Sequence, residues 1–467
     1  MSKIKRKEKS VYTCSSCGAM SPRWLGRCGG CGEWNTLVEE TQVRGGKGRG
    51  AASSSGGPTA RGASGAVPLG EVNHEDARRI PSGIDELDRT LGGGVVAGGV
   101  TLLGGDPGIG KSTLLMQALA KFAAAGHEAL YVTGEESASQ VALRGKRLGG
   151  AGMDRVKVLA TTDLEAVEKA VRACRPHVAV IDSIQTIRTR DLESAPGTVS
   201  QIREVSSRLI DLAKEGGVSL FLIGHVTKDG SLAGPKMLEH LVDTVLSFEG
   251  DRSHAFRLVR TVKNRFGPTH ELGVFEMVRQ GLREVPDPSA LFLAERPTAV
   301  AGSVVVPTAE GTRPLLVETQ ALVAPAVYGA ARRVATGVDA NRLAILLAVI
   351  ERKADIHILD RDAFVSVAGG ARVDERAIDL GLSLAVVSSL REVALGPKVA
   401  VFGEIGLAGE VRAVPRPGPR VVEAVKMGFT RVVLPKGNAE RLTTEERRGA
   451  ELMPVGTLNE ALEVVFD

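Results

Sequence analysis

One stretch of the chain combines glycines, a lysine and a hydroxyl in the spacing that binds phosphate. Residues 100–104 read as an apolar strand and residues 113–119 as the start of a helix, so a glycine-rich loop joins the two. The backbone N–H groups of such a loop attract phosphate oxygens. We expect the lysine to reach the β- and γ-phosphates of ATP and the serine to ligate Mg²⁺. The loop comprises Gly105, Asp106, Pro107, Gly108, Ile109, Gly110, Lys111, Ser112 and Thr113.

Carboxylates at the ends of two apolar strands could complete a hydrolytic site. Residues 128–133 lead into Glu135 and Glu136, on what we expect to be the strand beside the one that precedes the glycine loop. Either carboxylate can activate water for attack on the γ-phosphate, and we favour Glu135 with Glu136 as a helper. Surface acids at a strand exit are the alternative. Residues 177–181 lead into Asp182, an arrangement in which the carboxylate holds Mg²⁺.

Several basic side chains follow predicted strands of the same domain. His225 ends the apolar strand 218–224 and either senses the γ-phosphate or is an ordinary structural histidine. Loops at this edge of the sheet are where a DNA strand would be gripped. The candidates for that contact are Arg188, Arg190, Lys228, Lys236 and Arg265.

Four of the five cysteines lie near the amino terminus, in two C-x-x-C pairs separated by ten residues. This spacing predicts a closed four-thiolate site for structural Zn²⁺, with iron–sulfur ligation or a redox pair as alternatives. We expect Trp24 and Trp34, the only tryptophans, to form the small core of this unit, and base stacking is the alternative role. The metal ligands would be Cys14, Cys17, Cys28 and Cys31.

Composition divides the 467 residues into four parts. Residues 1–40 hold a basic tail and the cysteines, and residues 41–66 are a Gly/Ser/Arg tether that either only links or also grips phosphate weakly. Residues 67–286 and 287–467 alternate strands and helices, so both are expected to be α/β domains. A net charge of +4 permits nucleic-acid binding without requiring it. No apolar run approaches the length of a membrane span and no signal peptide is recognisable, so we expect a cytoplasmic protein without a membrane partner.

The motifs together resemble those of the bacterial RadA (Sms) family, DNA-repair ATPases of the RecA superfamily. The resemblance rests on the cysteine pairs, the glycine loop, residues 131–137, 224–228 and 232–236, and the family's signature pentapeptide Lys263-Asn264-Arg265-Phe266-Gly267. It covers the chain apart from the tail and tether. It implies a RecA-like P-loop ATPase core in a homo-hexameric ring, with ATP at subunit interfaces and single-stranded DNA in the channel.

The same resemblance implies ATP-driven movement on single-stranded and branched DNA, branch migration, and a RecA-type recombinase as partner. In that picture Lys263 and Arg265 link the nucleotide at one interface to DNA movement. From the residues alone, Lys-Asn-Arg could equally be an ordinary basic strand end. A cation supplied across an interface can stabilise the charge of phosphoryl transfer, which would make hydrolysis depend on assembly.

The carboxy-terminal part resembles the proteolytic domain of Lon, which uses a Ser-Lys dyad. By alignment the serine position falls at Ala377 and the lysine position near Gly418, so neither the nucleophile nor the base remains. We expect a scaffold without protease activity, whose candidate DNA-facing residues are Arg412, Arg416 and Arg420. The main alternative to a DNA-stimulated motor is an ATP-gated switch that binds DNA or a recombinase with little translocation.

Overall fold

The structure is a computed structural model, and it describes residues 9–14, 20–30, 32–34, 36–42, 79–226, 232–233, 237–250, 256–326, 329, 331–368 and 372–466. The chain divides into two compact units, one of residues up to 249 with 257–284, the other of residues from 285 onward with 250–256. Among the described helices, none is both long and apolar enough to cross a membrane.

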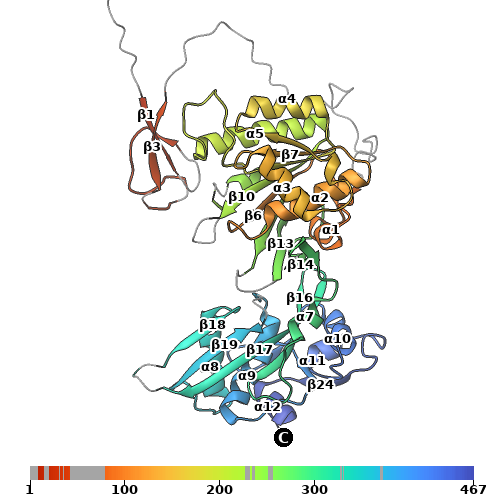
Figure 1. Cartoon of the computed structure of the whole chain (residues 1–467). Coiled ribbons are helices and arrows are strands. Elements are labelled where there is room, and N and C mark those ends of the chain that lie inside the picture. The colour runs from red at the N-terminus through yellow and green to blue at the C-terminus, as the bar shows by residue number, and fades with distance from the viewer. Residues whose placement is uncertain are drawn as a thin grey trace, which may run out of the picture. The chain divides into compact units, whose positions relative to one another are not determined.

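The amino-terminal residues form a small antiparallel sheet (Figure 1). Strand β1 (Lys9–Cys14) lies between β2 (Met20–Ser21) and β3 (Leu37–Gln42). The two strands that flank β1 both run antiparallel to it.

Cysteines, and not the two tryptophans, form the interior of the part of this small unit that the structure describes. Trp24 and Trp34 are 54% and 69% exposed, so the expectation that they form the core is wrong. The buried cluster consists instead of Cys14, Cys28 and Leu37. Inward-turned cysteines in so small a unit are compatible with stabilisation by a bound metal in place of a large apolar core.

A mainly parallel sheet forms the centre of the first unit, in the order β15-β14-β13-β12-β6-β10-β9-β7-β8, with β11 beside β10. Strands β12, β6, β10, β9, β7 and β8 run parallel, while β13 and β15 are antiparallel to β12 and β14. A two-stranded ribbon, β4 with β5, lies apart from this sheet. The strands are β4 (Arg79–Ile80), β5 (Val95–Val96), β6 (Val100–Gly105), β7 (Ala129–Thr133), β8 (Lys157–Ala160), β9 (Val178–Asp182), β10 (Ser219–Val226), β11 (Leu232–Ala233), β12 (Thr244–Glu249), β13 (Phe256–Asn264), β14 (Leu272–Val278) and β15 (Gly281–Glu284).

Helices cover both faces of this sheet because its buried strands are apolar on both sides. In β9, Val178 and Val180 face the core with α1, α2 and α3, whereas Ala179 and Ile181 face the core with α4 and α5. Figure 1 shows α4 and α5 together on one face, with α2 and α3 on the other. The helices are α1 (Asp85–Leu91), α2 (Lys111–Ala124), α3 (Ala138–Leu148), α4 (Leu164–Cys174), α5 (Val199–Gly216) and α6 (Met237–Leu241), with a 3-10 turn at Met153–Arg155.

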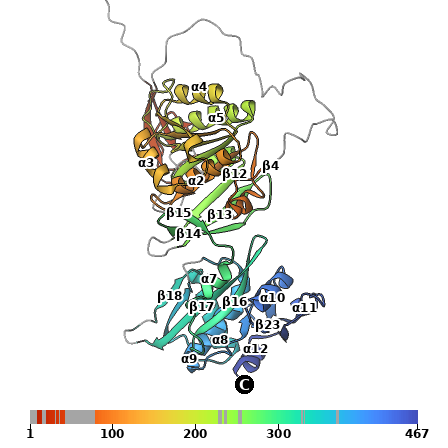
Figure 2. The ribbon, with the colours of Figure 1, turned by 45° about the vertical axis from the view of Figure 1, so that its right-hand side comes forward.

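The second unit is a separate α/β domain with a mixed sheet in the order β18-β19-β17-β16-β20-β23-β24. Helix α9 packs on β16 and β17, and α7 and α10 also contact β17 (Figure 2). The predicted α/β class is therefore confirmed for both units. Its elements are α7 (Pro288–Leu293), β16 (Ser303–Glu310), β17 (Arg313–Pro325), β18 (Arg333–Thr336), α8 (Ala340–Lys353), β19 (Arg361–Val367), a 3-10 turn (Arg376–Ile378), α9 (Asp379–Arg391), β20 (Val399–Val401), β21 (Glu404–Ile405), β22 (Val411–Arg412), α10 (Pro417–Lys426), β23 (Arg431–Pro435), α11 (Lys436–Ala439), β24 (Glu451–Val455) and α12 (Leu458–Phe466).

Candidate nucleotide-binding and hydrolysis site

The glycine loop joins the end of β6 to the start of α2, in the strand–loop–helix context that the sequence predicts. Gly105 and Gly110 have positive φ angles of 155° and 122°. A Cβ atom at Gly105 would lie only 2.5 Å from the carbonyl oxygen of Phe248, so a side chain cannot be accommodated there. The Lys111 ammonium donates to the carbonyls of Gly105 and Asp106, at 2.7 and 2.9 Å. The lysine thus lies against the loop that would surround the phosphates.

Three carboxylates act electrostatically on the Lys111 ammonium. Burial lowers the pKa of Lys111, and the negative charges of Asp182, Asp106 and Glu135 act in the opposite direction. These acids come from three separate segments of the chain, at the ends of β9, β6 and β7. A cation, oxygen ligands and a loop of backbone N–H groups are the groups that a magnesium–triphosphate complex requires. The residues present therefore fit ATP and Mg²⁺, with Ser112 and Asp182 as the oxygen ligands.

The sheet order corrects one expectation about the acids. Strand β7, which precedes Glu135, is not beside β6, because β9 and β10 lie between them. Glu135 still reaches the site, since the Ser183 hydroxyl donates to its Oε1 atom at 2.6 Å. Ser183 directly follows Asp182, so this hydrogen bond joins the ends of β7 and β9. Glu135 is exposed to solvent, so water can reach its carboxylate.

A tyrosine and an arginine that the sequence reasoning missed support these acids. The Tyr131 hydroxyl, buried in β7, donates to Asp182 Oδ2. Arg144 on α3 donates to the Tyr131 hydroxyl at 2.9 Å and forms an ion pair with Glu136 at 2.7 Å. Burial first, and then the Asp182 charge, raises the pKa of Tyr131, so the phenol keeps its proton. A signal for this contact was present in the sequence, because Tyr131 lies within a mainly aliphatic strand. A hydroxyl buried in such a strand needs a hydrogen-bond partner.

The strand register places His225 at the phosphate loop. In the pairing of β10 with β6, His225 lies opposite Gly105. This is the position that a γ-phosphate sensor would occupy, and the role itself stays a prediction. Lys228 and Lys236, two of the expected DNA contacts, lie outside the described residues.

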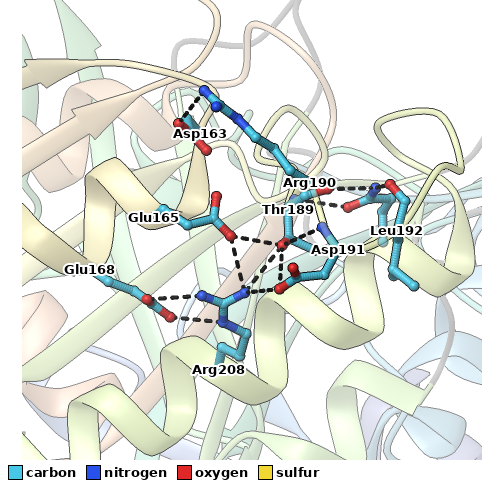
Figure 3. Close-up of polar contacts among 9 residues, drawn as sticks. Asp163, Glu165, Glu168, Thr189, Arg190, Asp191, Leu192 and Arg208 are labelled. Atoms are coloured by element: carbon cyan, nitrogen blue, oxygen red, sulfur yellow. Dashed lines mark hydrogen bonds and ion pairs between the residues drawn. The ribbon is translucent and has the colours of Figure 1, made fainter. Parts of the chain in front are cut away.

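The loop after β9, which carries two of the expected DNA contacts, is held to α4 and α5 by one arginine (Figure 3). Arg208 on α5 donates to both carboxylate oxygens of Glu168 at 2.9 Å and to Glu165 at 3.2 Å. The same guanidinium reaches the loop, donating to the Thr189 hydroxyl at 3.1 Å and to Asp191 at 3.0 Å. All of these contacts are charge-assisted or directed by the planar guanidinium, so they define the position of the loop base.

The two arginines of this loop project from that fixed base. The Gln201 side chain accepts from Thr189 N–H at 3.0 Å and donates to Thr189 carbonyl at 3.2 Å, which holds the loop backbone from below. Arg188 is exposed, and the Arg190 side chain is 82% exposed while forming an ion pair with Asp163 at 3.0 Å. Such an exposed ion pair contributes little to stability, so a phosphate group could replace Asp163 at small cost.

The cations of the pentapeptide are held by contacts within the chain. Lys263 donates to the carbonyls of Glu239 and Val242, both at 2.7 Å, at the end of α6. Burial, and then the charge of Arg265, lowers the pKa of Lys263. Arg265 forms an ion pair with Asp243 at 3.2 Å.

The other residues of the pentapeptide fix it to the start of the ATPase domain. Asn264 is buried and donates to the Leu91 carbonyl at 3.2 Å, at the end of α1. The Phe266 ring lies against Gly99, where an added Cβ would come within 3.0 Å of it. Gly267 also leaves little room, since an added Cβ would lie 3.3 Å from the Cα atom of Gly92. The motif is therefore a packed part of the core and not a loose strand end.

Two of the four amino-terminal cysteines lie within the described residues. Cys14 and Cys28 are buried near each other in one cluster. The Gly30 N–H donates to Cys28 Sγ at 3.3 Å, a contact that favours a negatively charged sulfur. Cys17 and Cys31 lie outside the described residues. The described pair fits structural Zn²⁺, which requires thiolates.

The second unit keeps no protease dyad at the aligned positions. Ala377 is buried in the 3-10 turn before α9, and Gly418 lies in α10. An added Cβ at Gly418 would lie 1.8 Å from Glu446 Oε1, so even a lysine there would first have to displace that carboxylate.

The expectation for Arg420 is wrong. It was expected on a DNA-facing surface, but its side chain is 1% exposed and paired with Glu375 at 2.6 Å. Arg412 and Arg416 remain candidates for that surface, since both are exposed.

Three family models match successive parts of the chain. Residues 12–39 match the rubredoxin metal binding domain, and residues 67–231 match an AAA domain. Residues 348–467 match the Lon protease (S16) C-terminal proteolytic domain. The order of these matches agrees with the predicted architecture.

Several curated proteins described as DNA repair protein RadA are similar over nearly the whole length. The chain is 50% identical over 461 residues to the protein of Pseudomonas aeruginosa, covering 99% of this chain and 100% of the relative. It is 48% identical over 461 residues to that of Halalkalibacterium halodurans, covering 98% and 99%. It is 46% identical over 456 residues to that of Bacillus subtilis, covering 98% of both.

Proposed function

The chain belongs to the RadA family of DNA repair proteins and contains an ATPase domain, and on this premise we propose that it is a DNA-stimulated motor. It would translocate on single-stranded DNA and promote branch migration of recombination intermediates. We assign residues 67–286 to the motor, 1–40 to a zinc-binding unit behind the tether 41–66, and 287–467 to a scaffold without protease activity.

The proposed hydrolytic roles follow from the convergence of side chains on the phosphate loop. Lys111 would bind the β- and γ-phosphates, and Ser112 and Asp182 would hold Mg²⁺, which neutralises phosphate charge when bound. Glu135 would accept a proton from the attacking water, because it is exposed and held by Ser183. Glu136 is engaged by Arg144 and would assist from there.

The observation that carries the motor proposal is the place of the pentapeptide in the sheet. Asn264 pairs with Thr244, and Thr244 pairs with Thr101 at the start of β6. The phosphate loop begins four residues further on, at Gly105, about 13 Å away at the rise of a β-strand. Lys263 and Arg265 therefore lie level with the start of β6, whereas the nucleotide of the same chain would bind at the end of β6.

Because Lys263 and Arg265 lie away from the phosphate loop of their own chain, we propose that they act on the nucleotide of a neighbouring chain. In a homo-hexameric ring, the Lys263 and Arg265 of one subunit would approach the nucleotide of the next. The rate of hydrolysis would then depend on the position of the neighbouring subunit. Coupling of hydrolysis to movement on DNA requires such a dependence. Arg188 and Arg190 would contact the DNA phosphates from the loop that Arg208 anchors.

The test combines ATP turnover and strand movement in one preparation. Single-stranded DNA should raise the rate of ATP hydrolysis, and a three-strand junction should be branch-migrated only with hydrolysable ATP. Replacing Lys111 by alanine in the same preparation provides the inactive control. DNA-stimulated turnover without any strand movement would instead favour the ATP-gated switch that recruits a recombinase, and turnover indifferent to DNA would refute both.

A further inference from the structure

We propose that Tyr131 and Arg144 are a positioning pair for Asp182, the carboxylate to which the proposed function assigns Mg²⁺. The inference rests on that function for the identity of the metal, and on hydrogen-bond geometry for everything else. Tyr131 lies in the middle of β7 and Arg144 on α3, so neither belongs to the phosphate loop or to the strand that ends in Asp182.

The direction of the hydrogen bonds is fixed by chemistry. A guanidinium has donors and no acceptor, so Arg144 donates to the Tyr131 oxygen at 2.9 Å. The phenol has a single proton, and that proton goes to Asp182 Oδ2. The tyrosine proton is therefore directed to the carboxylate, while the phenol oxygen accepts from Arg144 and also from the Ser112 hydroxyl. A donor that itself accepts from a cation is a stronger donor, which tightens the final bond.

Both members of the pair are held in place from outside the chain of hydrogen bonds. Tyr131 is fully buried among apolar residues of the ATPase core, so its ring cannot turn away. The Arg144 guanidinium lies 5.5 Å from the centre of that ring and forms its second contact with Glu136 at 2.7 Å. Helix α3 begins with a capping box between Ser137 and Gln140, which fixes the turn from which Arg144 projects.

The functional consequence concerns the orientation of a metal ligand. The carboxylate of an aspartate at a strand end can rotate about its Cβ–Cγ bond. A metal that binds it in one orientation must then offset the entropy lost when that rotation stops. The bond from Tyr131 occupies one oxygen and sets the plane of the group before any ligand arrives. We therefore expect the pair to add to the effect of Mg²⁺ on nucleotide binding, and to leave metal-free nucleotide binding unaffected.

The test measures the affinity of the full-length chain for a fluorescent ADP analogue, with Mg²⁺ and with EDTA. Tyr131→Phe keeps the ring and removes only the hydroxyl. It should leave the affinity in EDTA within about twofold and reduce the gain from Mg²⁺ roughly five- to tenfold. Arg144→Gln should reduce the same gain by a smaller factor. Arg147→Gln, on an exposed position of the same helix, is the matched control and should change neither value.

The outcomes separate this proposal from the proposed function. A Tyr131→Phe chain that keeps the whole Mg²⁺-dependent gain overturns the positioning pair, and so does a loss of affinity that is equal in Mg²⁺ and EDTA. If the native chain itself gains no affinity from Mg²⁺, the metal assignment in the proposed function fails first. Circular dichroism melting of each variant checks folding, and should Tyr131→Phe not fold, Arg144→Gln and Arg144→Lys decide the question by the same ratio.

Discussion

Replacing Arg420 by methionine should destabilise the second unit, because it leaves the half-buried carboxylate of Glu375 without its cation. Arg420 donates to the two oxygens of Glu375 at 2.8 and 2.6 Å and to the carbonyl of Pro307 at 2.7 Å. Its guanidinium also lies 5.8 Å from the ring centre of Phe402. Methionine would keep part of the volume and lose every one of these polar contacts.

The magnitude follows from what Glu375 retains. Removing one partner of a buried ion pair costs about 3–5 kcal/mol. Glu375 keeps a hydrogen bond from the Ala309 N–H at 2.7 Å, and its side chain is 22% exposed, so some solvation remains. We therefore expect the lower end, about 3 kcal/mol, which corresponds to a ~100-fold change in the equilibrium for opening.

Hydrogen exchange in the whole chain can isolate this effect in one unit. Peptides from α10 and β16 should lose about two orders of magnitude of protection in Arg420→Met, while peptides from β6 and β9 stay unchanged. Arg412→Met is the control, since Arg412 is exposed and pairs with its near neighbour Glu410. Adding Glu375→Gln should recover part of the loss. A loss of protection below threefold in α10 would refute the reasoning.

Three further predictions concern the motor and the zinc-binding unit. Lys111→Ala should abolish ATP hydrolysis in a phosphate-release assay, because its ammonium lies against the phosphate loop and would bind the β- and γ-phosphates, and retained turnover would contradict the assigned site. Cys28→Ser should release zinc, measured with a chromogenic chelator, while basal hydrolysis persists, and a general loss of folding would show that the units are not independent. Lys263→Ala should allow ATP turnover without branch migration. Since Lys263 also caps α6, Arg265→Ala should show the same separation, and normal branch migration in both would exclude a coupling role.

The phosphate site shows how far sequence reasoning reaches. The glycine loop, its flanking strand and helix, and Asp182 at the end of β9 were all predictable, because each depends on a local pattern of a few residues. The neighbour of β6 was not predictable in this way. Sheet order is a property of the whole domain, and the assumption that the next strand along the chain lies alongside placed β7 two strands too close.

Partners far apart in the chain were missed for the same reason. Tyr131 and Asp182 are separated by 51 residues, and Arg420 and Glu375 by 45. A sequence shows that a tyrosine or an arginine is present, while its burial depends on which segments fold over it. This is why Arg420 was taken for a surface residue although it lies inside the second unit.

The anchoring of the pentapeptide has a mechanical consequence for the motor. Asp243 accepts from the Arg265 guanidinium through one oxygen and from the Val100 N–H, the first residue of β6, through the other, at 3.2 and 3.1 Å. The opposite end of β6 is the phosphate loop. A hydrogen-bonded strand in the middle of a sheet hardly stretches, so a load applied to Arg265 by an adjoining subunit would be delivered to the phosphate loop as displacement instead of being absorbed on the way. In the proposed motor, β6 would thus transmit a displacement from the Asp243–Arg265 pair at its start to the phosphate loop at its end.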